Sequence, residues 1–201
     1  MFQSVQNQRI SRRALLITPF AFAGFAAMAT RRERPLPDPE QNGTGDEVEL
    51  TMFDNAGNSG ATVRVRKLVH TAPEWKKELT VEEFAVARQA GTEPPYSGRD
   101  WNNERAGLYR CVCCGNALYQ SREKFDSGTG WPSFWAPIAP ENIRTAEDRS
   151  FGVERTEVLC RKCDAHLGHL FDDGPKPTGL RYCMNSAAMR FVPFTASALS
   201  S

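Results

Sequence analysis

The sequence predicts a mainly β protein in which short N-terminal helices precede antiparallel strands and four cysteines form a zinc site. Three observations lead to this prediction. From Gly107 onward, short apolar runs alternate with Gly, Pro, Asp and Asn, as in antiparallel sheets. Two segments before Gly107 carry helix-capping signals. Two Cys-x-x-Cys pairs have the spacing of zinc ligands.

Residues 1–29 are expected to be an export signal. The pair Arg12-Arg13 precedes an apolar stretch at residues 14–29, which ends in the Ala27-Met28-Ala29 pattern of a signal-peptidase site. This stretch is interrupted by Pro19 and is shorter than the about 20 residues of a membrane-spanning helix. The paired arginines favour the twin-arginine route. We therefore expect a periplasmic or other extracytoplasmic protein; the alternative is an uncleaved signal, which would be its only membrane contact.

Residues 30–47 are interpreted as a solvated linker because Arg, Pro, Glu, Asn and Gly dominate without an apolar period. Residues 48–70 are predicted to form a hairpin, since β-rich runs at residues 48–53 and 61–69 flank a turn-prone segment. We interpret this hairpin as a peripheral extension of a main domain at residues 71–195.

Two short helices are predicted at the start of the main domain. Thr71 and Thr80 are each followed three residues later by Glu, the pattern of a capping box. The helices should end at about Leu79 and Gln89. The strands that follow are expected in the apolar runs Leu108–Val112, Ala117–Tyr119, Phe151–Leu159, Leu180–Cys183 and Met189–Phe194.

The charge pattern argues against a nucleic-acid partner. The formal net charge is +1, and neither sign is clustered outside the leader. A nucleic-acid-binding protein is expected to show a basic patch or stripe. The sequence also contains no phosphate-binding glycine loop and no dinucleotide fingerprint.

Four of the six cysteines are expected to hold one structural zinc ion. The pairs Cys111/Cys114 and Cys160/Cys163 could each supply two thiolates to a tetrahedral site. A site closed by four thiolates has no open position for water or substrate, so its role would be to join two loops. The alternatives are a redox dithiol in one pair, or disulfides, which an exported chain would permit.

Cys183 lies outside both pairs and is a candidate nucleophile. Arg181, two residues earlier, and a nearby imidazolium are expected to lower the pKa of its thiol. His166 and His169 are two of the three histidines, and the glycine between them suggests a tight backbone that turns both rings toward one pocket.

Four segments together resemble the B-type peptide methionine sulfoxide reductases, the methionine-R-sulfoxide reductases. They occur in the family's order within residues 75–194, and the resemblance excludes the leader, the linker and the hairpin. It implies two antiparallel β-sheets with short N-terminal helices. The four segments are residues 111–115, 125–134, 163–171 and 181–186.

The resemblance implies reduction of methionine-R-sulfoxide in oxidised proteins or peptides, with the free amino acid as a further candidate substrate. The thiolate of Cys183 would attack the sulfoxide sulfur, and His169, favoured over His166, would polarise or protonate the oxygen. Asn185 would hydrogen-bond the catalytic water or the sulfoxide. Trp131 would form an aromatic wall for the S-methyl group, and Phe191 is a weaker candidate for this wall, with core packing as its alternative.

The attack would leave a sulfenic acid on Cys183 that a second thiol must reduce. Many family members carry a resolving cysteine at the position of Thr129, which this chain lacks. The resemblance therefore implies an external donor, such as a thioredoxin-like protein. Cys113 is the other cysteine outside the zinc set, and a resolving role for it is the alternative to a structural one.

Two other function classes would fit part of the pattern. A non-catalytic zinc-binding module would not be expected to combine Cys183, His169 and Trp131. A thiol-disulfide oxidoreductase would place a Cys-x-x-Cys pair at the start of a helix in a βαβ unit, whereas Cys111 follows a strand-like run and Gly115 follows Cys114.

Overall fold

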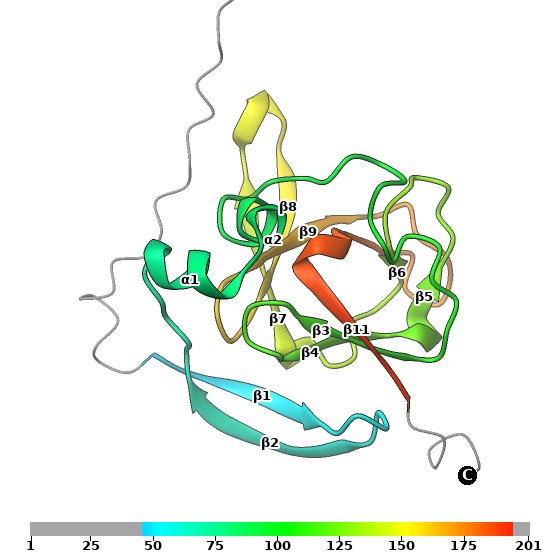
Figure 1. Cartoon of the computed structure of the whole chain (residues 1–201). Helices are drawn as coiled ribbons and strands as arrows, with labels where there is room; N and C mark the ends of the chain where they lie inside the picture. Colours follow the sequence, from blue (N-terminus) through cyan, green and yellow to red (C-terminus); the bar gives the residue numbers. More distant parts are fainter. Residues whose placement is uncertain (1–45, 195–201) are drawn as a thin grey trace, which may run out of the picture. The chain divides into compact units, whose positions relative to one another are not determined.

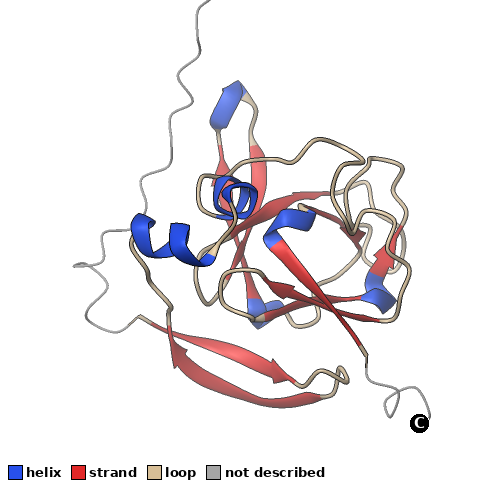
Figure 2. Ribbon diagram, viewed as in Figure 1, coloured by secondary structure: helices blue, strands red, loops and turns tan. Residues whose placement is uncertain are grey.

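The computed structural model describes residues 46–194. The predicted export signal and residues 30–45 of the predicted linker lie outside this part. Within it, strands predominate and the α-helices are short (Figure 2). The helices are α1 (Ala72–Glu78) and α2 (Val81–Ala87); the strands are β1 (Glu47–Phe53), β2 (Ser59–Arg66), β3 (Gly107–Cys111), β4 (Ala117–Gln120), β5 (Lys124–Phe125), β6 (Ser133–Phe134), β7 (Ile143–Asp148), β8 (Arg155–Cys160), β9 (His166–Phe171), β10 (Arg181–Met184) and β11 (Met189–Pro193).

Two antiparallel sheets build the main domain, which confirms the mainly β prediction. The larger sheet has the strand order β5-β6-β10-β9-β8-β7, and the smaller one has the order β11-β3-β4. β1 and β2 pair only with each other, as the predicted hairpin. No helix among the described residues is long and apolar enough to cross a membrane.

The hairpin is anchored to the main domain. Leu50 is buried, and Asn142 acts as a clamp on β1: its Oδ1 accepts from the Thr51 N–H and its Nδ2 donates to the Thr51 carbonyl, both at 2.9 Å. Arg110 Nη2 donates to the Phe53 carbonyl at 2.9 Å. Figure 1 shows the hairpin lying along one side of the sheets. Its exposed strand β2 and this limited set of contacts fit an added element rather than part of the core.

Both helices begin at the predicted caps. Thr71 and Thr80 each close a capping box with the glutamate three residues on. At the C-terminal end of α2, the Arg88 guanidinium lies 4.8 Å from the ring of the fully buried Trp75. It also donates a hydrogen bond to the Cys163 carbonyl at 2.8 Å. The helix pair is thereby attached to the turn that carries two of the predicted zinc ligands.

The strand predictions were correct for the apolar runs and incomplete for the polar ones. β8 begins only at Arg155, because residues 150–152 form a 3₁₀ turn before it. β5, β6, β7 and β9 were not predicted; β5 and β6 have only two residues each. β7 is a polar edge strand, and β9 contains two histidines and a glycine, so neither has the apolar run that marks a strand in the sequence.

An aromatic cluster fills the space between the two main sheets. The Tyr119 ring, from β4, stacks on Phe134 of β6 at 4.4 Å and lies 5.8 Å from Tyr182 of β10. The Tyr119 hydroxyl donates to Met184 Sδ at 3.2 Å. Because side chains alternate along a strand, burying Tyr182 in this core turns its neighbour Cys183 to the opposite face of the larger sheet.

Candidate active site

The four predicted zinc ligands meet in space. The Sγ atoms of Cys111, Cys114, Cys160 and Cys163 all lie within 4.8 Å of one another. Cys111 and Cys163 Sγ lie 3.6 Å apart, and Cys114 and Cys160 Sγ lie 3.5 Å apart. A disulfide needs about 2.05 Å, whereas tetrahedral zinc with Zn–S bonds of about 2.3 Å places its sulfurs about 3.8 Å apart. The convergence of four sulfurs therefore fits one structural zinc ion, and the disulfide alternative does not fit these distances.

The Cys113 thiol is buried beside the zinc ligands and does not line the cavity at Cys183. Cys113 lies in the turn between two of these ligands. This geometry supports the structural alternative for Cys113.

Cys183 lies at a cavity of about 140 Å³ on the outer face of the larger sheet. On β10 it pairs with His169 of β9 on one side and with Ser133 of β6 on the other. The residues that line the cavity come from three strands and three loops. They are Thr92, Trp131, Arg155, Gly168, His169, Phe171, Cys183, Met184 and Asn185.

A β-bulge places both predicted histidines on the same face of the sheet. His166 pairs with Leu159 while Gly168 pairs with Val158, so the register shifts at Leu167. The two imidazole centroids lie 5.3 Å apart. A Cβ atom on Gly168 would lie 2.1 Å from the Cys183 carbonyl oxygen; the close approach of β10 thus requires a glycine between the histidines. The expectation that both rings face one pocket holds only in part: the two rings are in contact, but His169 alone lines the cavity.

The two histidines have different partners, and only His169 lines the cavity. His166 is 2 % exposed, and its Nδ1 lies 2.6 Å from the buried carboxylate of Glu157. Its Nε2 is buried and makes no hydrogen bond within residues 46–194. His169 Nε2 instead lies 2.8 Å from Asp148 Oδ2, and Arg155 Nη2 donates to the same oxygen at 2.7 Å.

Burial shifts the pKa values of Cys183 and His169, the two titratable groups at the centre of the cavity. It raises the pKa of Cys183, although the charge of Arg181 and hydrogen bonds from Thr129 and Ser133 act in the opposite direction. Burial also lowers the pKa of His169, against the hydrogen bond to Asp148. The expected net lowering of the Cys183 pKa by Arg181 and an imidazolium is therefore wrong: the cation acts in the expected direction, but desolvation outweighs it, and a neutral imidazole is favoured.

Arg181 is held in a fixed position beside the cavity. Its Nε and Nη2 donate to the two carboxylate oxygens of Asp173, each at 2.8 Å, and its guanidinium lies 4.3 Å from the Phe171 ring. Arg181 and Cys183 are two residues apart on β10, so they project from the same face. Asp173 thus uses two of the five N–H donors of Arg181, and the charge of Arg181 favours the thiolate of Cys183.

Trp131 and Asn185 line the cavity, and the backbone of Glu93 holds both. The Trp131 Nε1–H donates to the Glu93 carbonyl at 3.0 Å, and the Glu93 N–H donates to Asn185 Oδ1 at 3.1 Å. Asn185 Nδ2 donates to the Leu167 carbonyl at 3.1 Å. An amide nitrogen carries two N–H donors, so one remains for a ligand.

Phe191 does not belong to this site, which corrects its prediction as a second substrate wall. It lies on β11 in the smaller sheet, in register with Tyr109, and its ring is 5.1 Å from that of Tyr109 and 4.8 Å from the Arg105 guanidinium. The alternative of core packing is correct for this residue. The second aromatic side chain at the cavity is Phe171.

Thr129, at the position expected to carry a resolving cysteine, belongs to a chain of hydroxyl groups. Thr129 Oγ1 lies 4.0 Å from Cys183 Sγ and 2.8 Å from Ser127 Oγ, which in turn lies 2.7 Å from Ser133 Oγ. These groups can hydrogen-bond a charged or oxidised sulfur, but they cannot form a disulfide with it.

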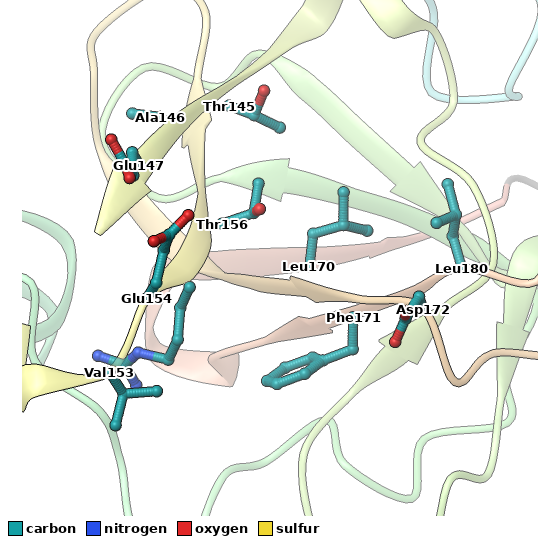
Figure 3. Close-up of a pocket in the computed structure, with 11 residues that line it drawn as sticks. Thr145, Ala146, Glu147, Val153, Glu154, Thr156, Leu170, Phe171, Asp172 and Leu180 are labelled. Carbon is teal, nitrogen blue, oxygen red and sulfur yellow. The ribbon is translucent and has the colours of Figure 1, made fainter. Parts of the chain in front are cut away.

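A larger hollow, of about 760 Å³, adjoins this cavity, and Arg155 and Phe171 line both. Figure 3 shows its lining from β7, β8 and β9, with Leu170 and Phe171 extending to opposite sides of their strand. Leu170 is in register with Tyr182, so it lies on the face opposite to Cys183. The smaller cavity is therefore the one that combines a nucleophile, an imidazole and an aromatic wall.

Several residues at the site were not identified from the sequence: Thr92, Glu93, Asp148, Arg155, Glu157, Phe171 and Asp173. The sequence did contain one indication of the pairing between Asp148 and Arg155. Opposite charges seven residues apart around a Ser-x-Gly turn can pair across a hairpin, and the structure places them in register. Glu93 holds Trp131 and Asn185 through its backbone, and its buried carboxylate accepts hydrogen bonds from the N–H groups of Ser186 and Ala187 at 2.7 and 2.9 Å.

Comparison with known proteins gives a consistent result. The chain matches the SelR domain over residues 79–193, more than half of its length. It is 56 % identical over 118 residues to the peptide methionine sulfoxide reductase MsrB of Synechococcus sp. strain RCC307, covering 59 % of this chain and 87 % of that protein. The protein of the same name from Herminiimonas arsenicoxydans is 54 % identical over 125 residues, covering 62 % and 91 %. That from Hahella chejuensis is 54 % identical over 125 residues, covering 62 % and 90 %.

Proposed function

This chain belongs to the SelR-domain family of B-type peptide methionine sulfoxide reductases, and from that premise we propose that it reduces methionine-R-sulfoxide in oxidised proteins and peptides. The observation that carries the proposal is the cavity in which Cys183, His169 and Trp131 converge. Each supplies a function that the reaction needs: a sulfur nucleophile, a group that can exchange a proton, and an apolar aromatic wall.

In the proposed reaction the Cys183 sulfur attacks the sulfoxide sulfur while the sulfoxide oxygen takes up a proton. The net result is oxygen transfer: the thiol and the sulfoxide become a sulfenic acid on Cys183 and a free thioether. His169 is proposed to move the proton, and Arg181 to stabilise the thiolate through its charge. The spare N–H of Asn185 is proposed to hydrogen-bond the sulfoxide oxygen or the catalytic water. His166, buried on Glu157, is proposed to support the position of His169.

Trp131 is proposed to hold the S-methyl group. Its indole N–H is occupied by the Glu93 carbonyl, so the ring orientation is fixed and its apolar surface is available. Contacts between sulfur and an aromatic ring contribute about 0.3–1.5 kcal/mol. The preference for the R epimer follows in this proposal from the fixed positions of the methyl wall and His169 on either side of the sulfur.

The sulfenic acid is proposed to be reduced by an external thiol donor of the thioredoxin-like type. Two donor thiols, or one dithiol, are oxidised to a disulfide; the Cys183 thiol is regenerated and the oxygen leaves as water. Thr129 in place of a resolving cysteine, and Cys113 in the zinc turn, support a donor from outside the chain.

We also propose that the protein is exported, because residues 1–29 have the pattern of an export signal. Fractionation of cells that make the full chain would test this proposal.

The deciding experiment is reduction of the separated R and S epimers of a blocked methionine sulfoxide by the full chain with dithiothreitol. We expect turnover of the R epimer alone, and none by Cys183→Ser. The chemical reductant removes dependence on the natural donor. A folded, zinc-loaded protein that turns over neither epimer would contradict the proposal and favour a non-catalytic zinc module. Equal turnover of both epimers would refute the stereospecificity.

A further inference from the structure

We propose that Asp148 and Arg155 are positioning residues that fix the His169 imidazole, leaving its Nδ1 as the nitrogen that exchanges a proton with Cys183 and the sulfoxide oxygen. This inference rests on the proposed function, in which His169 moves the proton. Neither residue belongs to the segments that suggested the activity. Both are placed at the site by the hairpin β7–β8.

Sheet geometry brings the three side chains to one face. Asp148 and Arg155 are in register across β7 and β8, and His169 lies on β9, the next strand. The Asp148 carboxylate reaches over β8 to His169 Nε2 at 2.8 Å. Its side chain is 14 % exposed and that of His169 is 11 % exposed, so the hydrogen bond is largely shielded from solvent. Cys183 lies on β10, on the other side of His169 from Asp148.

The charges determine which nitrogen carries the hydrogen. Burial opposes ionisation of Asp148, but hydrogen bonds from Ser150 and His169 and the charge of Arg155 outweigh it and hold its pKa well below the usual range. An ionised carboxylate only accepts hydrogen bonds, so Nε2 must carry the hydrogen. The neutral ring then has its lone pair on Nδ1, and Nδ1 has no hydrogen-bond partner within residues 46–194.

With this tautomer, His169 can accept and return the proton that the reaction must move. Burial favours a neutral Cys183 thiol and a neutral His169 ring, so a proton must leave sulfur before attack. Nδ1 can accept that proton and give it to the sulfoxide oxygen, which returns the ring to its starting tautomer. Asp148 would stabilise the transient imidazolium, as a carboxylate does for an imidazole in hydrolytic triads.

Arg155 also acts on the pKa of His169, in the direction opposite to Asp148. It keeps Asp148 ionised and in place, with Nη2 at 2.7 Å, yet its charge lowers the pKa of His169 whereas Asp148 raises it. The charged and titratable groups around the ring come from four strands. They are Asp148 of β7, Arg155 and Glu157 of β8, His166 of β9, and Arg181 and Cys183 of β10.

The first test is imidazole NMR on the full chain, which has only three histidines. Long-range ¹H–¹⁵N spectra should show the Nε2–H tautomer for His169, assigned by its absence from His169→Gln. In Asp148→Asn we expect His169 to titrate at lower pH, and in Arg155→Gln at higher pH. Shifts of opposite sign would not follow from general loosening of the site. A His169 with Nδ1–H in the wild-type chain, or one that titrates unchanged in both variants, would overturn the inference.

The second test is the pH profile of turnover with dithiothreitol. Asp148→Asn should lower kcat by about 10- to 100-fold, part of the about 10²–10⁴ typical of acid–base catalysis, with KM within about threefold. The limb of the profile assigned to His169 should move with its NMR titration. Glu147→Gln is the matched control, because Glu147 is adjacent but exposed and paired with Arg149; it should behave as wild type.

The outcomes separate the two proposals. An active wild type whose Asp148→Asn variant keeps its kcat and pH profile would refute the positioning role alone. An inactive wild type would refute the proposed function, and the tautomer would still be decided by NMR. If Asp148→Asn is unfolded by circular dichroism, Arg155→Gln provides the decisive shift.

Discussion

Replacing one zinc ligand should cost a large part of the stability of the domain. The perturbation is Cys111→Ser, which removes one of the four converging sulfurs. Cys111 and Cys163 are 52 residues apart in the chain, and Cys114 and Cys160 are 46 apart. Zinc therefore closes a loop of about fifty residues, and a cross-link over such a loop restricts the unfolded chain by about 4 kcal/mol.

That magnitude can be compared with the whole domain. Domains of this size are stable by about 5–15 kcal/mol, so a loss of about 4 kcal/mol is a substantial fraction. At about 2–4 °C per kcal/mol, the melting temperature should fall by about 8–16 °C. The structure gives a further reason: Arg88 connects the helices to the Cys163 turn, so loosening this turn should also loosen the helix pair.

The assay combines metal analysis with thermal unfolding followed by circular dichroism. Wild type should contain about one zinc per chain, and Cys111→Ser well below one. Cys113→Ser is the matched control, since Cys113 is a buried cysteine of the same turn outside the ligand set; it should retain zinc. The four-ligand site would be refuted if Cys111→Ser kept both its zinc and its melting temperature, or if Cys113→Ser lost zinc to the same extent.

Three further results are expected. Trp131→Ala should raise KM for the sulfoxide by about 2- to 10-fold through loss of the sulfur–aromatic contact, and an unchanged KM in steady-state assays would exclude Trp131 from the methyl site. Thr129→Cys should form a disulfide with Cys183 after one turnover, because Oγ1 lies 4.0 Å from Sγ and the loop must move by only about 2 Å to reach bonding distance; mass spectrometry would detect the linkage, and a persistent sulfenic acid would contradict the expectation. Since the pKa of Asp148 is lowered on folding, the stability it contributes should be present above about pH 5 and decline as the pH falls toward 1; urea unfolding of wild type at pH 7 and pH 3 should show a steeper decline than Asp148→Asn, and equal declines would refute it.

The helices and the apolar strands could be predicted because their signals are local. Thr71 and Thr80 carry their caps within three residues, and β3, β4 and β11 are mainly apolar, with one polar or charged residue each. The zinc ligands were predictable for the same reason, as each pair is a local motif. That they converge was an inference from chemistry, which the clustered sulfurs confirm.

The remainder of the site depends on long-range pairing. Asp148 becomes a partner of His169 only because β7, β8 and β9 are adjacent, and the signals of β7 and β9 are weak in the sequence. The error on the Cys183 pKa has a related origin. The nearby Arg181 is visible in the sequence, but the burial that outweighs its charge is a property of the folded cavity.

The bulge at Leu167 limits how this segment of the chain can vary in length. With three residues from one histidine to the next, a regular strand would send the two rings to opposite faces. The extra residue restores the common face. A single insertion between His166 and His169 would therefore move one imidazole to the other side of the sheet. An insertion at the tip of the β7–β8 hairpin would also disturb the site, because Ser150 in this tip hydrogen-bonds both Asp148 and Arg155. Length variation in this protein should thus be confined to turns that do not contact the cavity, and β9 should keep its length.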